Sequence, residues 1–345
     1  MSTPSSPRSG STSWSPKSSI ITFKREQRRA PSDRRAGVSG ADVTDQTGRT
    51  ALVTGANKGI GFFTSAALAR AGAHVILACR DAGRADAAVR AIRARCAAEG
   101  VAASLEVVHL DTADADSVAV AASALARRER LDLVVANAGM VHPPEQRRLT
   151  AGGDELVLAT NMLGHFALIA ALLPVIVRTP GARVVSLGSL ATRLNRFLVG
   201  DLQLELEYTP WRAYAQSKTA LESFGFELDR RMRAAELSAS STVAHPGYSI
   251  SGRTPRIPGV NEPTRGTVFV DSLQASFTQS KQRGAHSVLA AATRQDAVGG
   301  SYWGPHWLMR GEPVMQEPSQ ASSDPDVARR VWEFAEARTG IRFEL

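Results

Sequence analysis

The sequence predicts an α/β fold in which helices cover both faces of a parallel sheet. Short apolar runs alternate with longer helix-like segments between residues 49 and 244, which is typical of strands joined by crossover helices. A glycine-rich turn separates the first apolar run from the first helix-like segment. The 345 residues are enough for one large domain or two small ones, and we expect a single domain.

The expected elements follow one another without an internal repeat. Strands are predicted at about 50–54, 74–79, 105–110, 131–136, 183–187 and 240–244, because these runs are short and apolar. An alanine-rich helix ends at Gly72, and further helices are predicted over about 84–98, 114–128, 153–177 and 211–235. Beyond residue 300, the stretch 301–305 indicates a last short strand and 324–338 an amphipathic helix.

Residues 1–45 are predicted to form a disordered tail that precedes a domain at 46–345. The tail is rich in Ser, Pro and Arg and shows neither strand nor helix periodicity. Residues 1–40 carry +6 of the net charge of +8, so the folded part is nearly neutral and is not expected to bind nucleic acid. A targeting peptide is the alternative for the tail, although no clear amphipathic helix is visible.

Cysteine content and hydropathy indicate the cellular compartment in which the protein is expected. The two cysteines, Cys79 and Cys96, suggest neither a disulfide framework nor a metal site, which fits a reducing compartment. The longest apolar run, 166–177, contains Pro174 and is shorter than the roughly 18 residues that a membrane span needs. We therefore expect a buried helix there, no membrane span and a cytoplasmic protein.

The turn after the first strand is predicted to bind a dinucleotide in a Rossmann-type, doubly wound fold. Its glycines allow the backbone to turn tightly and to approach a pyrophosphate, whose charge meets the amides at the helix N-terminus. The turn consists of Gly55, Ala56, Asn57, Lys58, Gly59, Ile60 and Gly61. Strand, turn, helix and strand follow in the order that such a site requires.

The end of the second strand predicts which dinucleotide binds. Asp or Glu is usual there when NAD is preferred, whereas this chain has Arg80. A guanidinium matches a 2′-phosphate in charge and geometry, and Lys58 adds a second cation. NADP(H) is therefore the expected cofactor. The alternative is that Arg80 is a solvated strand end paired with Asp81.

Tyr214 and Lys218 lie four residues apart in a segment that favours a helix, so their side chains share one face. A lysine cation near a phenol stabilises the phenolate, which predicts a lowered pKa for Tyr214 and a role in proton transfer. Because the same spacing occurs by chance in many helices, the pair alone would also fit a solvated helix edge.

Taken together, these motifs resemble the short-chain dehydrogenase/reductase family over about residues 48–310. The ordered set runs from Thr54-Gly55 through Asp111, Asn137-Ala138-Gly139, Asn161, Ser189, Tyr214 and Lys218 to Pro246-Gly247. The strings A-C-R-D at 78–81 and N-M-L-G-H-F at 161–166, with the long segment between Ser189 and Tyr214, are similar to the retinol-dehydrogenase-like branch.

The resemblance implies a role for each matching residue. Tyr214 would be the general acid, Lys218 would lower its pKa and hold the nicotinamide ribose, and Ser189 would orient the substrate carbonyl. Asn161 would position a water for proton relay. The remaining matches imply cofactor contacts: Asp111 to the adenine, Asn137, Ala138 and Gly139 beside the cofactor, Pro246 and Gly247 at the nicotinamide, and Ser251 as a further contact.

Structural alternatives exist for several of these residues. Asp111 would also serve as a helix cap, Asn137 to Gly139 as a plain turn, and His165 is expected to pack against a helix rather than to catalyse. The family usually shows two adjacent serines where this chain has Gly188 and Ser189. We therefore expect Ser189 to match the catalytic serine with a looser backbone around it.

The segment 190–212 and the loop after Gly247 are expected to shape the substrate site. Their apolar and aromatic residues are Phe197, Leu198, Leu202, Tyr208, Trp211 and Tyr248. Such a lining favours an uncharged hydrophobic carbonyl or alcohol, although the same residues would also serve as packing. The loop 249–261 is predicted to close over the site as a lid.

The predicted function is NADP(H)-dependent interconversion of a hydrophobic aldehyde or ketone and its alcohol. Two other classes stay open: a non-catalytic NADPH-binding sensor, and an interaction protein with a basic docking tail. A homo-oligomer is compatible with the sequence, which does not identify the oligomeric state.

Overall fold

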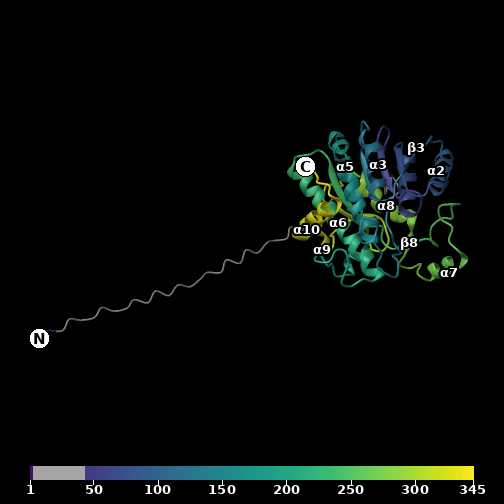
Figure 1. Cartoon of the computed structure of the whole chain (residues 1–345). Helices are drawn as coiled ribbons and strands as arrows, with labels where there is room; N and C mark the ends of the chain where they lie inside the picture. The colour runs from purple at the N-terminus through teal and green to yellow at the C-terminus, as the bar shows by residue number, and fades with distance from the viewer. Residues whose placement is uncertain (3–42) are drawn as a thin grey trace. The chain divides into compact units, whose positions relative to one another are not determined.

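An eight-stranded sheet in the order β10-β9-β6-β5-β4-β1-β2-β3 forms the centre of the protein in a computed structural model that describes residues 1–2 and 43–345 (Figure 1). Its strands are β1 (Thr50–Thr54), β2 (His74–Cys79), β3 (Ser104–His109), β4 (Leu133–Ala136), β5 (Arg183–Leu187), β6 (Ser240–Ala244), β9 (Tyr302–Pro305) and β10 (Pro313–Gln316). Strands β1 to β6 and β9 are parallel, which confirms the predicted fold class. β10 differs, because it pairs antiparallel with β9.

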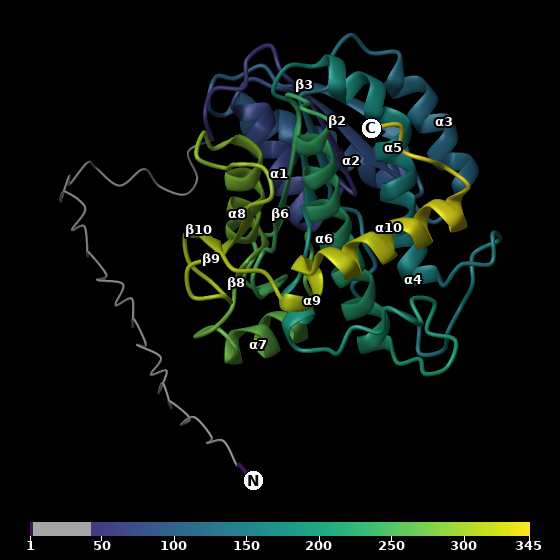
Figure 2. The same ribbon diagram turned by 90° about the vertical axis from the view of Figure 1, so that its left-hand side faces the viewer.

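Helices cover both faces of the sheet, as predicted. Two separate apolar clusters lie on its two sides. One contains residues of α3 (Ala115–Ala126), α5 (Gly164–Arg178), α6 (Pro210–Ala234) and α10 (Pro325–Thr339), and the other residues of α1 (Gly59–Arg70), α2 (Ala82–Ala97) and α8 (Lys281–Thr293). In Figure 2, α10 runs across α6 on the outer side of the first layer. The sequence analysis did not predict α8.

Side-chain caps fix several helix starts. Asp81 accepts the amide of Arg84 at the start of α2, and Asp114 accepts two amides at the start of α3. Thr209 caps α6, whose first residue is Pro210. These caps explain why the helices begin within a few residues of the predicted positions.

An aromatic cluster attaches the C-terminal helix to the rest of the domain. Trp332 of α10 packs against Phe166 of α5 and Phe224 of α6, with ring centroids 5.4 and 5.6 Å apart. Phe343 joins the same cluster, with its ring centroid 4.5 Å from that of Trp332. The guanidinium of Arg231 lies 4.2 Å above the Trp332 ring. The segment predicted as an amphipathic helix thus completes the core.

The helix predicted over 153–177 has three parts in the structure. A single turn, α4 (Leu156–Leu158), leads into a π-helical stretch at Ala159–Leu163 and then into α5. The whole stretch Leu156–Arg178 is long and apolar enough to cross a membrane, but most of it is buried inside the domain. A core helix of a folded domain meets the same criterion.

Val43 and Thr44 belong to the folded domain, because both contact it near its N-terminal boundary. Val43 packs against the α1 and α2 cluster, and the Thr44 hydroxyl donates to the carbonyl of Thr293 at 3.2 Å. The domain therefore begins a little before the predicted residue 46. Most of the predicted tail, residues 3–42, lies outside the described residues.

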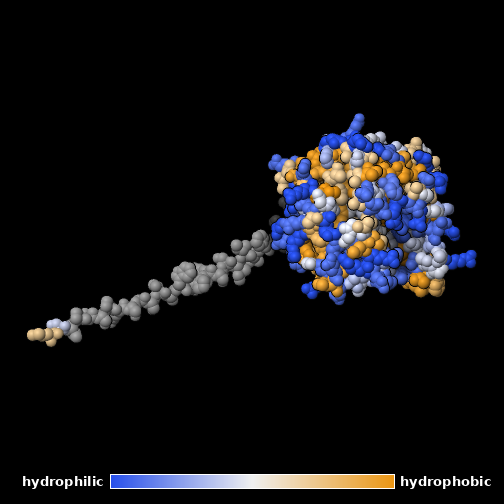
Figure 3. All heavy atoms as spheres, in the orientation of Figure 1, coloured by the Kyte–Doolittle hydropathy of each residue, from blue (hydrophilic) through white to orange (hydrophobic). Residues whose placement is uncertain are grey.

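A less regular segment follows β6. β7 (Ser249–Ile250) pairs with β8 (Gln279–Ser280), and α7 (Arg265–Leu273) lies between them. α7 contains no buried residue. Figure 3 shows apolar side chains at the lower right of the molecule, where Figure 1 places α7. The predicted lid at 249–261 is thus the first part of a longer excursion from the sheet.

Candidate active site

The predicted site residues gather at the carboxyl ends of β1, β4, β5 and β6, where the strand order reverses between β1 and β4. Ligands bind at this position in doubly wound sheets. Gly55 and Gly59 have positive φ angles of 63° and 60°, so the turn uses conformations that favour glycine. A side chain on Gly61 would overlap the amide nitrogen of Asn137. The turn therefore packs directly against the segment after β4.

The start of α1 is suited to an anion. Lys58 is its N-cap residue and makes no side-chain cap hydrogen bond, so no side chain caps the first amides of the helix. Backbone amides at a helix N-terminus bind phosphate oxygens. The residues at this position therefore fit a pyrophosphate.

Thr54, at the end of β1, joins three parts of the site. Its hydroxyl oxygen accepts the amides of Asn137 and Ala138, both at 2.9 Å. The side-chain amide of Asn137 donates to the carbonyl of Thr54 at 2.7 Å. The ends of β1 and β4 are thus tied together beside the glycine turn.

His165 continues this network and is fully buried. Its Nδ1 lies 2.9 Å from the carbonyl of Asn161, which can only accept, so Nδ1 carries the proton and Nε2 accepts from Thr54 at 2.9 Å. Burial lowers the pKa of His165 to about 4, which keeps the imidazole neutral at physiological pH. Helix packing was expected here, and the link to Thr54 could not be predicted from the sequence.

Asn161 lies in the π-helical stretch, a feature that often marks functional positions. Its Oδ1 accepts the amide of Met140 at 2.7 Å, and its Nδ2 donates to the Ser217 hydroxyl at 2.8 Å. An added Cβ on Gly139 would lie 3.2 Å from Asn161 Oδ1 and 3.6 Å from Lys218 Nζ. Gly139, Asn161 and Lys218 therefore meet at one point.

Tyr214 and Ser189 are in direct contact. The Tyr214 hydroxyl donates to Ser189 Oγ at 3.1 Å, and the Ala191 amide donates to the same oxygen at 3.2 Å. Because Ser189 Oγ accepts in both bonds, its own proton is available to a substrate oxygen. Lys218 Nζ donates to the carbonyl of Leu187 at 2.7 Å, at the end of β5.

The predicted lowering of the Tyr214 pKa is wrong for this structure. Burial raises the pKa of Tyr214, the bond to Ser189 lowers it in part, and the Glu222 carboxylate raises it further. The ammonium of Lys218 does not bond the phenol and instead donates to the Leu187 carbonyl. Burial also lowers the pKa of Lys218, to about 8. The tyrosine therefore holds its proton at neutral pH.

Glu222 is a fully buried carboxylate that the sequence analysis missed. It follows Lys218 by one helical turn, and its Oε1 accepts the amide of Ser189 at 3.1 Å and the hydroxyl of Tyr302 at 3.2 Å. Burial raises its pKa to about 7. The i, i+4, i+8 series of polar residues in α6 was the signal that could have identified it.

Glu222 also explains the unusual glycine beside the catalytic serine position. A Cβ on Gly188 would overlap Oε1 of Glu222. A larger residue here would force the Glu222 side chain to move. The backbone is held by Glu222 through the Ser189 amide, so the expected looser backbone is not observed.

Arg80 lies at the end of β2 with its side chain 69% exposed and 3.4 Å from Asp111. The alternative partner, Asp81, instead caps α2 and pairs with Arg84. Asp111 accepts the amide of Ala113, whereas the cap of α3 is Asp114. Arg80 and Asp111 thus stand together at the edge of the predicted cofactor site.

Lys281, the first residue of α8, is a second lysine at the glycine turn that the sequence analysis did not identify. Its Cδ lies 3.8 Å from the position of a Cβ on Gly59, and its Nζ donates to Ser251 Oγ at 2.6 Å. Burial lowers its pKa, and the nearby Lys58 contributes. Because α8 was not predicted, no sequence signal connected it with the turn.

The Pro246-Gly247 turn follows β6. Gly247 has a φ of 63°, and the Pro246 carbonyl accepts from the side chains of Ser249 at 2.7 Å and Gln279 at 2.8 Å. The amide of Tyr248 donates to the carbonyl of Met309 at 2.8 Å. The turn is thus held by residues far away in the sequence.

The predicted substrate-lining residues divide into two groups. Leu202 is buried, Phe197 packs against the core, and Leu198 and Tyr208 pack in a small cluster with Leu204. Trp211, in contrast, is 51% exposed, and its ring lies 6.4 Å from that of Tyr214. Tyr248 is also exposed. Phe197, Leu198 and Tyr208 are half-buried, and Trp211 and Tyr248 are the most exposed members of the set.

Comparisons with known proteins are consistent with this geometry. A family model described as short chain dehydrogenase matches residues 49–248. Retinol dehydrogenase 14 from Mus musculus is 32% identical over 313 residues, which cover 88% of this chain and 89% of that protein. Retinol dehydrogenase 13 from Homo sapiens is 31% identical over 299 residues, 85% of each chain. The crystal structure of an uncharacterized protein from Mycobacterium paratuberculosis is 34% identical, with a TM-score of 0.71, and the match covers 89% of this chain and 98% of that one.

Proposed function

This chain belongs to the short-chain dehydrogenase family, and we propose that it interconverts a hydrophobic aldehyde or ketone and its alcohol with NADP(H). The relatives support the coarser statement that it is an oxidoreductase acting on CH–OH and C=O groups with a nicotinamide cofactor. The observation that carries the finer proposal is the contact between Tyr214 and Ser189, with Lys218 one turn further along α6.

In the proposed reduction, Tyr214 donates its proton to the carbonyl oxygen. Its raised pKa keeps that proton in place until negative charge develops on the substrate. Ser189 donates a second hydrogen bond to the same oxygen and stabilises the charge. The bound nicotinamide supplies the hydride. Lys218 would hold the nicotinamide ribose, and Asn161 would order the water that returns a proton to Tyr214.

The proposed cofactor site consists of residues from six segments. They are Gly55, Asn57, Lys58, Gly59, Ile60 and Gly61 of the glycine turn, Arg80, Asp111, the triplet Asn137, Ala138 and Gly139, Tyr214 and Lys218, and Pro246 and Gly247. We add Lys281, because its ammonium lies beside the turn and Ser251. The uncapped start of α1 and the two lysines support an anionic ligand at this position.

NADP(H) is preferred in this proposal because Arg80 is exposed and lies at the edge of the site. Charge-assisted hydrogen bonds contribute about 1.5–3 kcal/mol, so Arg80→Asp should weaken NADPH binding by roughly 10- to 100-fold. NADH binding should change much less. Titration of both cofactors by fluorescence measures this, and equal losses for the two would contradict the preference.

The substrate class rests on exposed aromatic residues, of which Trp211 lies beside Tyr214, and on the names of the relatives. Trp211 and Tyr248 offer apolar surface, and the relatives are retinol dehydrogenases. We propose an uncharged hydrophobic carbonyl or alcohol such as a retinoid, a steroid or a long-chain aldehyde.

The decisive experiment measures NADPH and NADH oxidation over a panel of such carbonyl compounds. General acid catalysis contributes about 10²- to 10⁴-fold, so Tyr214→Phe should reduce turnover by that factor while cofactor binding is retained. Turnover that survives in Tyr214→Phe would exclude the assigned proton donor. Cofactor binding without turnover across the panel would favour the non-catalytic sensor.

We further propose a cytoplasmic, homo-oligomeric protein. The support for the location is that the long apolar stretch Leu156–Arg178 is mostly buried in the domain. Cell fractionation and light scattering of the purified full chain test the two statements. Recovery in the membrane fraction, or a monomeric mass, would contradict them.

A further inference from the structure

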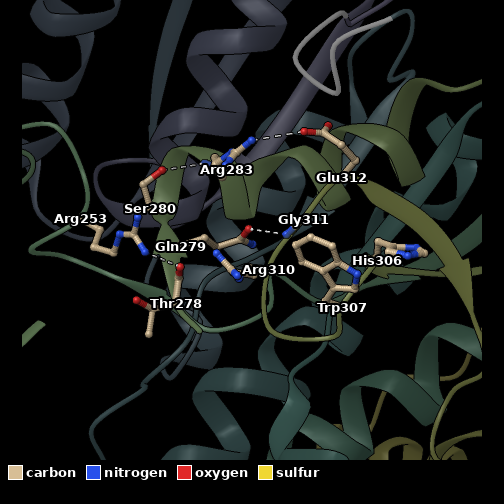
Figure 4. A pocket seen from close by; sticks show the side chains of 10 residues that line it. All are labelled: Arg253, Thr278, Gln279, Ser280, Arg283, His306, Trp307, Arg310, Gly311 and Glu312. Carbon is tan, nitrogen blue, oxygen red and sulfur yellow. Dashed lines mark hydrogen bonds and ion pairs between the residues drawn. The ribbon is translucent and has the colours of Figure 1, made fainter. Parts of the chain in front are cut away.

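A hollow of about 420 Å³ lies outside the predicted active site. It is bounded by β8, the start of α8 and the loop between β9 and β10 (Figure 4). None of the residues proposed for catalysis or cofactor binding lines it. Its volume is in the range of small-molecule sites.

Three arginines from separate segments line this hollow. Arg253 follows β7, Arg283 lies in the first turn of α8, and Arg310 lies in the β9–β10 loop. Glu312 is the only acidic residue among the lining residues, and it lies 3.4 Å from Arg283. The hollow therefore has an excess of positive charge, to which the N-terminal end of α8 adds.

Two of the guanidinium groups are held in place by the protein itself. Nη1 of Arg253 donates to the carbonyls of Ala275 and Thr278. The guanidinium of Arg310 lies 5.3 Å from the centre of the Trp307 ring. A guanidinium has five N–H donors, so Arg253 retains donors for a ligand after these two bonds. Groups that are ordered before binding lose less entropy when a ligand arrives.

The lining also supplies a flat apolar surface. Trp307 is 65% exposed. In Figure 4 its ring stands at one side of the hollow, close to Arg310. An indole with an exposed surface can stack on a planar ligand while arginines hold an anionic group.

We propose that this hollow is a second binding site, for a small organic molecule that joins a phosphate group to a flat apolar ring. Arginine binds phosphate through paired N–H donors, and a dianion matches three guanidinium groups opposed by one carboxylate. The flat ring of the ligand stacks on the indole of Trp307. The proposal does not rest on the reductase activity, because no lining residue is assigned to the active site, although Gln279 of the lining also donates to the Pro246 carbonyl.

Phenyl phosphate is the probe of choice, since it carries both features. It is titrated by calorimetry and tryptophan fluorescence into the full chain saturated with NADPH, so that cofactor phosphate sites are already filled. One saturable event is expected, with phenol failing to bind. In Arg310→Gln and in Arg253→Gln, each of which removes a charged donor, affinity should fall by at least about 10-fold. Arg256→Gln is the matched control, because Arg256 lies on the same segment, is exposed and does not line the hollow.

The outcomes distinguish binding in the hollow from binding in the active site or elsewhere on the surface. Loss of binding in Arg310→Gln, with binding retained in Arg256→Gln and in Tyr214→Phe, supports the proposal. Loss of the fluorescence change in Trp307→Phe would show that the ring of phenyl phosphate stacks on Trp307. Phenyl phosphate that fails to bind the saturated protein, or whose affinity is the same in all the arginine variants, overturns the proposal. A thermal unfolding curve for each variant shows that it is folded.

Discussion

Two regions of the molecule hold their side chains in opposite ways. The frame, strands β1 to β6 with helices α1 to α6, holds its functional side chains buried and bonded, as with Thr54, Asn161 and Lys218. The cover, residues 248–280 with the loop 306–312, consists of two-residue strands, an exposed helix and an arginine-lined hollow. The frame fixes the positions of the reacting groups. The cover exposes the side chains for which we propose ligand contacts, such as Tyr248 and Trp307.

The largest difference between the two regions should appear in the free energy of unfolding. Phe166 is fully buried in the frame, so Phe166→Ala should destabilise the protein by about 3–5 kcal/mol through the cavity it leaves. Chemical denaturation measures this value. A loss below about 1 kcal/mol would mean that the aromatic cluster is loosely packed and that the frame is not rigid.

A second test concerns the glycine next to Ser189. Gly188→Ala introduces a methyl group that overlaps Glu222, and overpacking of this kind costs about 1–3 kcal/mol. The same substitution in a Glu222→Ala background should cost much less, because the overlapping oxygen is gone. A double-mutant cycle measures the coupling. Equal costs in both backgrounds would show that Glu222 does not restrict this position.

A third test uses pH. The pKa of His165 is about 4 in the folded protein and 6.5 in the unfolded chain, so between these values the unfolded chain binds a proton that the folded chain does not. Stability contributed by the neutral imidazole is therefore full above pH 6.5 and falls as the pH decreases. Between pH 6.5 and about pH 5.5, the free energy of unfolding should fall by about 1 kcal/mol more in the wild type than in His165→Gln. Buried His245 is present in both proteins, so its own pH dependence cancels. Parallel stability curves would contradict the assignment of a neutral His165.

The smallest effect is expected in the cover. Phe269 is exposed on α7, so Phe269→Ala should change the free energy of unfolding by no more than about 0.5 kcal/mol. It is the matched counterpart of Phe166→Ala, since both remove the same ring. A loss above about 1.5 kcal/mol would show that α7 packs against a surface in solution and that the two regions are not so different.

Sequence patterns predicted the frame well because its signals are local. A short apolar run, a glycine turn and an alanine-rich helix can each be recognised within a few residues, and their alternation indicates a parallel sheet. Tyr214 and Ser189 also meet as expected, since α6 and the end of β5 lie side by side, whereas the ammonium of Lys218 is bonded to the Leu187 carbonyl. The pKa of Tyr214 could not be predicted, because it depends on burial and on Glu222.

The cover was not predicted because its contacts connect distant residues. β7 and β8 are short and pair across about 30 positions, with Ser249 opposite Gln279. Lys281 reaches Ser251 and the glycine turn only because α8 packs against α1. No local pattern reports such a placement. The hollow lined by three arginines arises in the same way, from residues that lie far apart in the sequence.

The pairing of β7 with β8 has a consequence for protein engineering. Residues 251–278 connect Ile250 with Gln279, two residues that lie in adjacent paired positions, and they touch the core through Ile257. A segment whose two ends already meet can be lengthened, shortened or exchanged at little entropic cost, since doubling a loop adds only about 0.6 kcal/mol. We expect grafts of other sequences between these two residues to fold. The acid–base groups of α6 and β5 would then serve new substrates without being altered themselves.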